Sequence, residues 1–226
     1  MGRWEPNASG RLRVAAMELY VERGFEQTTV AEIAQRAGLT ARTFFRYFAD
    51  KREVLFDGTN VLQERMVGAL VGAPESTTPL DAVAAALGAA ADILGDRHDY
   101  ARQRYAVIAA NPELQERELM KMAALSAALA GGLRRRGVAA TEASLAAETA
   151  IAVFRVAYER WVGAKTDQGL ATVMRESMDQ LRALAAGPAG TAGPAGTVGP
   201  AGTAGTPRVR AGRPASARAS RSRAGG

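Results

Sequence analysis

The chain has 226 residues, of which 47% are hydrophobic, so it holds enough apolar material to fold around a core. It contains no cysteine, and His98 is its only histidine. These counts exclude disulfides, thiolate or multi-histidine metal centres, and cysteine nucleophiles. The sequence also has no glycine-rich nucleotide loop and no evident acid–base pair, so it argues against an enzyme and predicts no metal and no cofactor.

The net charge of +6 is unevenly distributed along the chain. Residues 187–226 hold six arginines and no acidic residue, which leaves 23 basic and 23 acidic side chains in residues 1–186. Any excess of positive charge that could bind nucleic acid in residues 1–186 must therefore be local. Because neither a signal-peptide core nor a run of about 18 apolar residues occurs, we expect a cytoplasmic protein with no membrane partner.

Helical signals cover most of the chain and no segment alternates like a strand, which predicts an all-α fold. A first helix, roughly 9–23, stops at Gly24, a residue that can cap a helix in the left-handed conformation. A second helix starts at Thr29, which has Glu32 at the spacing of a capping box, and a third starts at Thr40.

Asp50 marks the start of a fourth, longer helix, and after Pro74 the helices become longer and rich in alanine and leucine. The five expected there cover residues 79–95, 98–110, 112–136, 141–165 and 169–186. The predicted architecture is an N-terminal three-helix helix-turn-helix domain followed by a C-terminal helical bundle for ligand binding and dimerisation. The expected parts are an N-terminal extension (1–8), the helix-turn-helix domain (9–57), the ligand-sensing and dimerisation domain (58–186) and a tail (187–226).

The tail has a glycine at every third position and then an arginine-rich end. A collagen-like stretch is the weaker interpretation, because the seven triplets hold only four prolines and a triple helix needs three chains. Disorder is the better one. Two roles stay open for the tail: an electrostatic tether that speeds the search for a DNA site, or a dispensable solubilising extension.

The most informative segment runs from Thr29 to Phe48, where two helices of about eight residues meet at a short turn that contains glycine. The turn is too short for an antiparallel hairpin, so the second helix, about 40–47, is free to enter a major groove. Phe44 and Phe48 are four residues apart and share the face that packs into the core. The other faces carry Ala41, Arg42, Phe45 and Arg46, and the basic side chains of the region are Arg36, Arg42, Arg46, Lys51 and Arg52.

Only one acid, Asp50, accompanies these five cations, and such a local excess suits a phosphate backbone. The alternative interpretation is a helical corner with a solvated basic face, in which the charges and the aromatic spacings coincide by chance. Arg42 lies early on the third helix and can reach O6 and N7 of guanine with two hydrogen bonds. Lys51 would add an ammonium group to the backbone N–H groups at the start of the fourth helix, which already favour a phosphate.

Short motifs with characteristic spacing fill the segment Arg11–Phe56: Gly24-Phe25, Thr28-Thr29-Val30, Glu32-Ile33-Ala34, Ala37-Gly38-Leu39, Thr43-Phe44-Phe45-Arg46-Tyr47-Phe48 and Asp50-Lys51. In these motifs the chain resembles the tetracycline-repressor (TetR) family of transcription regulators. The resemblance implies phosphate contacts by Thr29, Thr40, Tyr47 and Lys51, and base contacts by Ala41, Arg42 and Thr43. Phe45 departs from the tyrosine of many members, and because it cannot donate to a phosphate we expect apolar contact with a sugar or a thymine methyl.

The last two predicted helices carry apolar stripes that match each other, which favours a four-helix bundle across a twofold axis. The expected dimer interface comprises Ala146, Ala150, Val153, Ala157, Val173, Met174, Ser177, Met178 and Leu181. Methionine and aromatic side chains suit an adaptable effector pocket, although ordinary core packing is the alternative for each of them. The expected pocket residues are Tyr105, Met120, Met122, Phe154, Tyr158 and Trp161.

These patterns together predict a homodimer that binds double-stranded operator DNA, in the simplest case a repressor released from a palindrome by a small-molecule effector. The alternative is an architectural protein that binds DNA with little sequence preference, aided by its basic tail. The two differ in whether a palindromic site is retained against excess random DNA.

Overall fold

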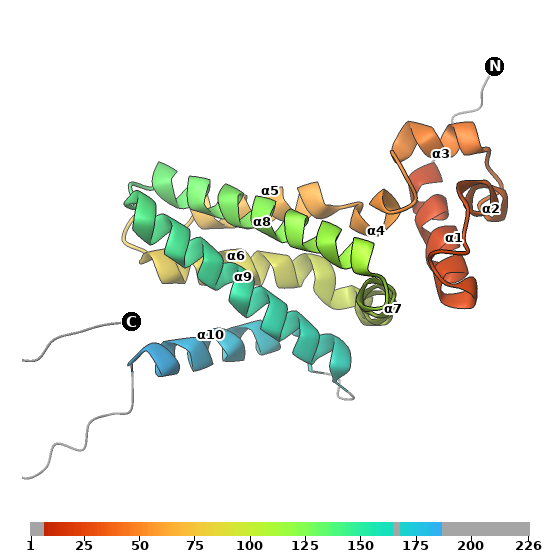
Figure 1. Cartoon of the computed structure of the whole chain (residues 1–226). Helices are drawn as coiled ribbons and strands as arrows, with labels where there is room; N and C mark the ends of the chain where they lie inside the picture. The colour runs from red at the N-terminus through yellow and green to blue at the C-terminus, as the bar shows by residue number, and fades with distance from the viewer. Residues whose placement is uncertain (1–6, 165–167, 187–226) are drawn as a thin grey trace, which may run out of the picture. The chain divides into compact units, whose positions relative to one another are not determined.

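A computed structural model of the chain describes residues 7–164 and 168–186, and in these ranges every regular element is a helix. The all-α prediction is thus confirmed, while the expectations for residues 1–6 and for the tail lie outside the described residues. The N-terminal part holds α1 (Ala8–Arg23), α2 (Val30–Arg36), α3 (Ala41–Tyr47) and α4 (Glu53–Phe56) (Figure 1). No helix in the described ranges is long and apolar enough to cross a membrane.

The longer helices follow and pack on one another as a bundle. They are α5 (Thr59–Val71), α6 (Pro79–Leu94), a 3₁₀ turn η1 (Gly95–Arg97), α7 (His98–Ala109), α8 (Pro112–Arg135), α9 (Ala140–Gly163) and α10 (Leu170–Ala186). From α6 onward each α-helix begins and ends within two residues of its predicted limits. The agreement arises because proline, glycine and asparagine punctuate this part of the sequence at nearly every helix end.

The predicted helix starts in the N-terminal part are also confirmed. Thr29 and Glu32 form the capping box, in which the Thr29 hydroxyl accepts from the backbone N–H of Glu32 and the Glu32 carboxylate accepts from the backbone N–H of Thr29. Thr40 caps α3 by accepting from the backbone N–H of Thr43 at 3.2 Å. Each cap satisfies a helix N–H that would otherwise lack a partner.

The expected long fourth helix is wrong, because the chain breaks it into α4 and α5. Gly58 lies between them with φ of 93°, a conformation that L side chains rarely adopt. Asp50 does act as the expected cap, since its carboxylate accepts from the backbone N–H groups of Arg52 and Glu53. Burial raises the pKa of Asp50, but these bonds and the Arg52 guanidinium outweigh it and lower the pKa overall.

Among the described residues, the buried side chains form two hydrophobic clusters. The first joins α1 to α4 and is extended by Val107 and Ile108 of α7 and by Leu114 of α8. The second fills the bundle formed by the helices from α5 to α10. Because α7 and α8 contribute to both, a displacement in the bundle has a packed path to the N-terminal helices.

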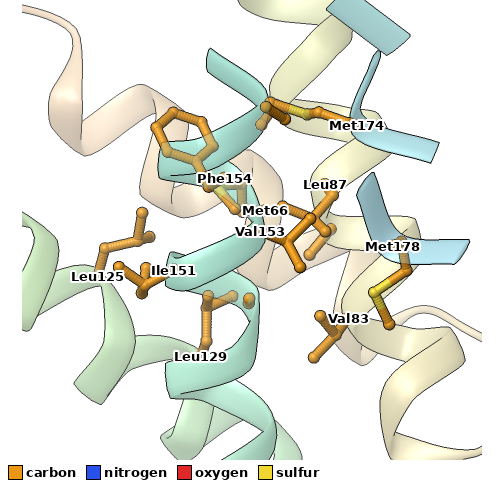
Figure 2. Packing of buried hydrophobic residues seen from close by; sticks show 14 of the residues in the cluster. Met66, Val83, Leu87, Leu125, Leu129, Ile151, Val153, Phe154, Met174 and Met178 are labelled. Carbon is orange, nitrogen blue, oxygen red and sulfur yellow. The ribbon is translucent and has the colours of Figure 1, made fainter. Parts of the chain in front are cut away.

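The predicted dimer interface is wrong in its residues, because those side chains fill the core of a single protomer. Figure 2 shows Val153 of α9 grouped with Met178 of α10 and with Val83 and Leu87 of α6. The stripe faces inward because α10 packs against both α9 and α6. The eight residues thus buried are Ala146, Ala150, Val153, Ala157, Val173, Met174, Ser177 and Met178, and Leu181 packs partly buried against the same cluster.

Candidate functional site

Helix α3 is anchored from behind by two phenylalanines, as predicted. Phe44 and Phe48 are buried in the N-terminal cluster, and their ring centres lie 5.4 Å apart. This fixes which face of the short helix points outward. The side chains left exposed there are Thr40, Ala41, Arg42, Phe45, Arg46 and Tyr47, with Thr43 half-buried beside them.

The turn between α2 and α3 is held by backbone and side-chain bonds. Gly38 has φ of 66°, and the Leu39 N–H donates to the Ala34 oxygen at 2.8 Å across it. The Arg11 guanidinium of α1 donates to the Ala37 oxygen at 2.7 Å. Since α3 has only two turns and little helical stability of its own, these contacts are what present its outer face as a rigid surface.

The cations of this region are used in different ways. Arg36 pairs with Glu18 and Glu22 of α1, its contact with Glu22 measuring 2.8 Å, and Arg52 pairs with Asp50 at 2.8 Å. Both are therefore largely neutralised by the protein itself, so the local excess of charge inferred from the sequence overstates the available charge. Of the five cations, Arg42, Arg46 and Lys51 have no ion pair among the described residues, and the two arginines project from the exposed face of α3.

Arg46 and Tyr47 form a small polar cluster at the end of α3. The Arg46 guanidinium donates to the Tyr47 hydroxyl at 3.1 Å and lies 4.9 Å from the centre of that ring. Phe45 is exposed and packs edge-on against Phe44, with ring centres 5.6 Å apart. An exposed large apolar ring beside two polar groups is typical of a surface that meets a partner.

Lys51 does not project toward solvent, which contradicts its predicted contact with a phosphate. Its ammonium donates to the backbone oxygens of Phe25, Glu26 and Thr28 at 2.8, 3.2 and 3.1 Å, and it lies 4.3 Å from the Phe25 ring centre. An ammonium has three N–H groups, so all of its donors are in use. Tyr20 of α1 adds a bond to the Lys51 backbone oxygen at 2.6 Å. Lys51 therefore stabilises the loop between α1 and α2.

A pocket of about 600 Å³ opens among α4 and the helices from α5 to α9. Four of the six residues expected in an effector pocket line it, namely Tyr105, Met122, Phe154 and Tyr158, and the binding of an effector there stays a prediction. The rings of Phe154 and Tyr158 are stacked there, with centres 5.8 Å apart. Burial raises the pKa of the Tyr158 phenol, so its hydroxyl stays protonated and able to donate.

Two of the predicted pocket residues lie elsewhere. Met120 is on the exposed side of α8, two residues before the lining residue Met122. Trp161 is buried in the bundle core, where its ring packs edge-on against His98 and its backbone oxygen lies 2.9 Å from Nε2 of that histidine. Helical spacing alone could have separated Met120 from Met122, because residues two apart do not share a helix face, but it could not separate Trp161 from Phe154 and Tyr158.

The sequence reasoning missed three basic residues of the pocket, and for Arg104 and Arg155 it left contact with an anionic ligand open as the weaker alternative to pairing with surface acids. Arg13 of α1 and Arg97, Arg104, Lys121 and Arg155 of the bundle all line the pocket. Arginine and lysine at such positions are more often surface charges, so no signal in the sequence distinguished them. Within the described ranges, no three histidine or carboxylate side chains are grouped so as to hold a metal ion.

Two family models match this chain, and each covers one of its parts. The model of bacterial regulatory proteins of the tetR family matches residues 12–57, the region of α1 to α4. The model of the MftR C-terminal domain matches residues 77–186, the region from α6 to α10. The chain belongs to the TetR family of transcription regulators.

The chain is also similar to individual transcription regulators. The HTH-type transcriptional regulator TcmR of Streptomyces glaucescens is 39% identical over 74 residues, which is 33% of this chain and 33% of TcmR. The mycofactocin biosynthesis regulator named MftR in Mycobacterium tuberculosis is 28% identical over 165 residues, covering 72% of this chain and 83% of that protein. A TetR-family structure from Syntrophomonas wolfei shares the fold, with a TM-score of 0.61, 13% identity and coverage of 80% and 96%.

Proposed function

We propose that this TetR-family protein is a dimeric, sequence-specific repressor of transcription that a small-molecule effector releases from a palindromic operator. The observation that carries the proposal is the outer face of α3, where Arg42 and Arg46 are exposed and have no ion pair among the described residues, while Arg36 and Arg52 are paired with acids. A short, rigidly held helix with exposed arginines that no acid neutralises suits entry into a major groove. The protein would act on chromosomal DNA in the cytoplasm.

The contacts to DNA divide into two kinds. Ala41, Arg42 and Thr43, at the start of α3, would face base edges, with Arg42 reading a guanine. The phosphate contacts would come from Thr29, Thr40, Arg46 and Tyr47. Phe45 would lie against a sugar or a thymine methyl, since it is exposed and has no donor.

The dimer would use the outward side of α9 in place of the buried stripe that was predicted. Leu145 is 66% exposed and Val156 is 51% exposed. Thr149 and Ala152 lie between them at helical spacing, and all four form one stripe of apolar and small side chains. Two copies of this stripe can pack across a twofold axis, which places both α3 helices on one DNA molecule.

The pocket would hold the effector. It borders α4, which follows directly after the recognition helix, and aromatic side chains supply much of its wall. An effector that binds better when the two α3 helices are wrongly spaced lowers the affinity for the operator by shifting the population of dimers. By linkage, the operator must lower the affinity for the effector by the same factor.

Selection of binding sites from random duplexes tests this proposal with purified protein at physiological salt. A repressor is expected to recover a palindrome whose half-sites have centres about 34–36 Å apart, and to keep it under excess random DNA. The alternative, an architectural DNA-binding protein, would recover no common site and would lose its duplex as competitor is added. That second result would overturn the proposal.

A further inference from the structure

One arginine links the pocket to α4. The Arg104 side chain is only 17% exposed, and its Nε donates to the backbone oxygen of Leu55 at 2.8 Å. Its Nη1 donates to Glu118 at 3.0 Å, and its guanidinium lies 5.2 Å from the Phe56 ring centre. Leu55 is in a helix of a single turn, so its oxygen has no helical partner of its own and depends on this bond.

A second group of contacts holds the N-terminal end of α4. The Glu53 carboxylate, at the start of α4, pairs with Arg117 and with Lys121 of α8. Lys121 also lines the pocket. Two pocket cations, one on α7 and one on α8, therefore hold the one-turn helix that connects the recognition helix to the bundle.

The pocket has an excess of positive charge. Five basic and three acidic side chains line it, and each acid already has a partner. Asp57 pairs with Arg13 at 3.3 Å, Glu118 with Arg104, and Glu159 accepts from the Tyr105 hydroxyl at 3.1 Å. Three of the five cations are themselves paired among the described residues, Lys121 with Glu53 in addition to the two arginines just named, so Arg97 and Arg155 carry the excess of positive charge that an entering anion would meet.

The rest of the wall is mostly apolar and includes the stacked rings of Phe154 and Tyr158 together with aliphatic residues such as Leu62 and Met122. We propose that the effector is an apolar molecule bearing one anionic group, and that this group binds Arg104 in competition with the Leu55 oxygen. The inference rests on the proposed function for its regulatory part. Removing the guanidinium from Leu55 loosens α4, and with it the position of α3.

Two fluorescent compounds that differ only in an anionic group test the ligand class on the full-length protein. They are 1-anilinonaphthalene-8-sulfonate and N-phenyl-1-naphthylamine, which has the same rings without the sulfonate. Both fluoresce more strongly in an apolar site. The sulfonate is expected to bind at least about tenfold more tightly, the typical effect of one charged hydrogen bond in a sheltered site.

Three variants assign that preference to a residue. Arg104→Met is expected to abolish it while still binding the neutral compound, and Arg104→Lys to retain part of it. Arg102→Met, an exposed arginine on the same helix that does not line the pocket, is the matched control and is expected to keep the full preference. Circular dichroism and melting temperature establish that each variant is folded, and Arg104→Lys keeps the test decisive should Arg104→Met unfold.

The proposal is overturned if the wild-type protein binds both compounds equally, or if a folded Arg104→Met keeps the preference. Its regulatory part is tested on the selected operator. There the sulfonate should weaken binding by the wild-type protein and by Arg102→Met but not by Arg104→Met, and the neutral compound should have no effect. If the sulfonate does not change the operator affinity of the wild-type protein, the proposed competition with the Leu55 oxygen is wrong. Absence of any preferred operator would instead refute the proposed function. The ligand class would still be tested in that case, because the comparison of the two compounds needs no DNA.

Discussion

Arg42 is the side chain whose loss should change sequence preference most directly. The Arg42→Ala variant is expected to weaken operator binding by about 1–3 kcal/mol and to relax the requirement at one base pair in each half-site, because a bidentate contact to guanine is removed. Fluorescence anisotropy with operators that vary at one position measures both effects.

Arg36→Ala is the matched control for that measurement. Arg36 is also an arginine of the α2–α3 region, but it pairs with Glu18 and Glu22. Its preference among operators should stay that of the wild-type protein, and its stability should change by no more than about 1 kcal/mol, as for other exposed ion pairs. Equal loss of discrimination in both variants would mean that Arg42 does not read a base.

Lys51 provides a second test at the scale of one residue. Lys51→Met is expected to lower the free energy of unfolding by about 1–3 kcal/mol, because three backbone oxygens lose a charged donor. Urea denaturation measures that loss. The salt dependence of DNA binding should stay unchanged, whereas Arg46→Ala should reduce the slope by about one ion. A normal stability together with a reduced slope for Lys51→Met would restore the phosphate contact inferred from the sequence.

At the scale of whole elements, the sequence predicts the helices well and their outward faces poorly. Helix ends followed from local signals such as Thr29, Thr40 and Gly137, whose effect does not depend on distant residues. The inward stripe of α10 looked the same as a dimer stripe, because periodicity shows that a face is apolar but not whether the partner belongs to the same chain. For the same reason Trp161 could not be separated from the pocket residues that surround Tyr158.

The division of the fourth helix was missed because a glycine inside a helical pattern is often tolerated. Gly58→Ala is expected to destabilise the protein by about 1 kcal/mol or more, since the position has positive φ and a Cβ there meets no clash that could otherwise explain the cost. Gly68 lies inside α5 with equally open surroundings. Gly68→Ala should therefore stabilise by about 0.5–1 kcal/mol. Thermal unfolding of both variants measures whether their changes in stability have opposite signs. A change of the same sign in both would contradict a positive φ at Gly58.

At the scale of the whole molecule, the dimer decides whether the two recognition helices can reach one operator. Val156 is the C-terminal member of the outward α9 stripe and would be covered when two copies of the stripe pack together. In Val156→Arg each protomer would bring an unpaired charge into the interface, which costs several kcal/mol and raises the dimer dissociation constant by about a hundredfold or more. Sedimentation equilibrium measures that shift, and the affinity for a palindrome should fall to that for a single half-site.

Val61 on α5 is 55% exposed, nearly the same as Val156, and lies outside the proposed interface. The Val61→Arg variant adds the same charge to the same protein, so it should stay dimeric and bind the palindrome like the wild-type protein. Dissociation of both variants would indicate a general effect of added charge, and dissociation of neither would place the dimer interface on another face. If Val156→Arg alone dissociates, and its melting temperature extrapolated to low protein concentration equals that of the wild-type monomer, the interface is assigned to α9. The reason is that only a contact between protomers makes the melting temperature depend on protein concentration.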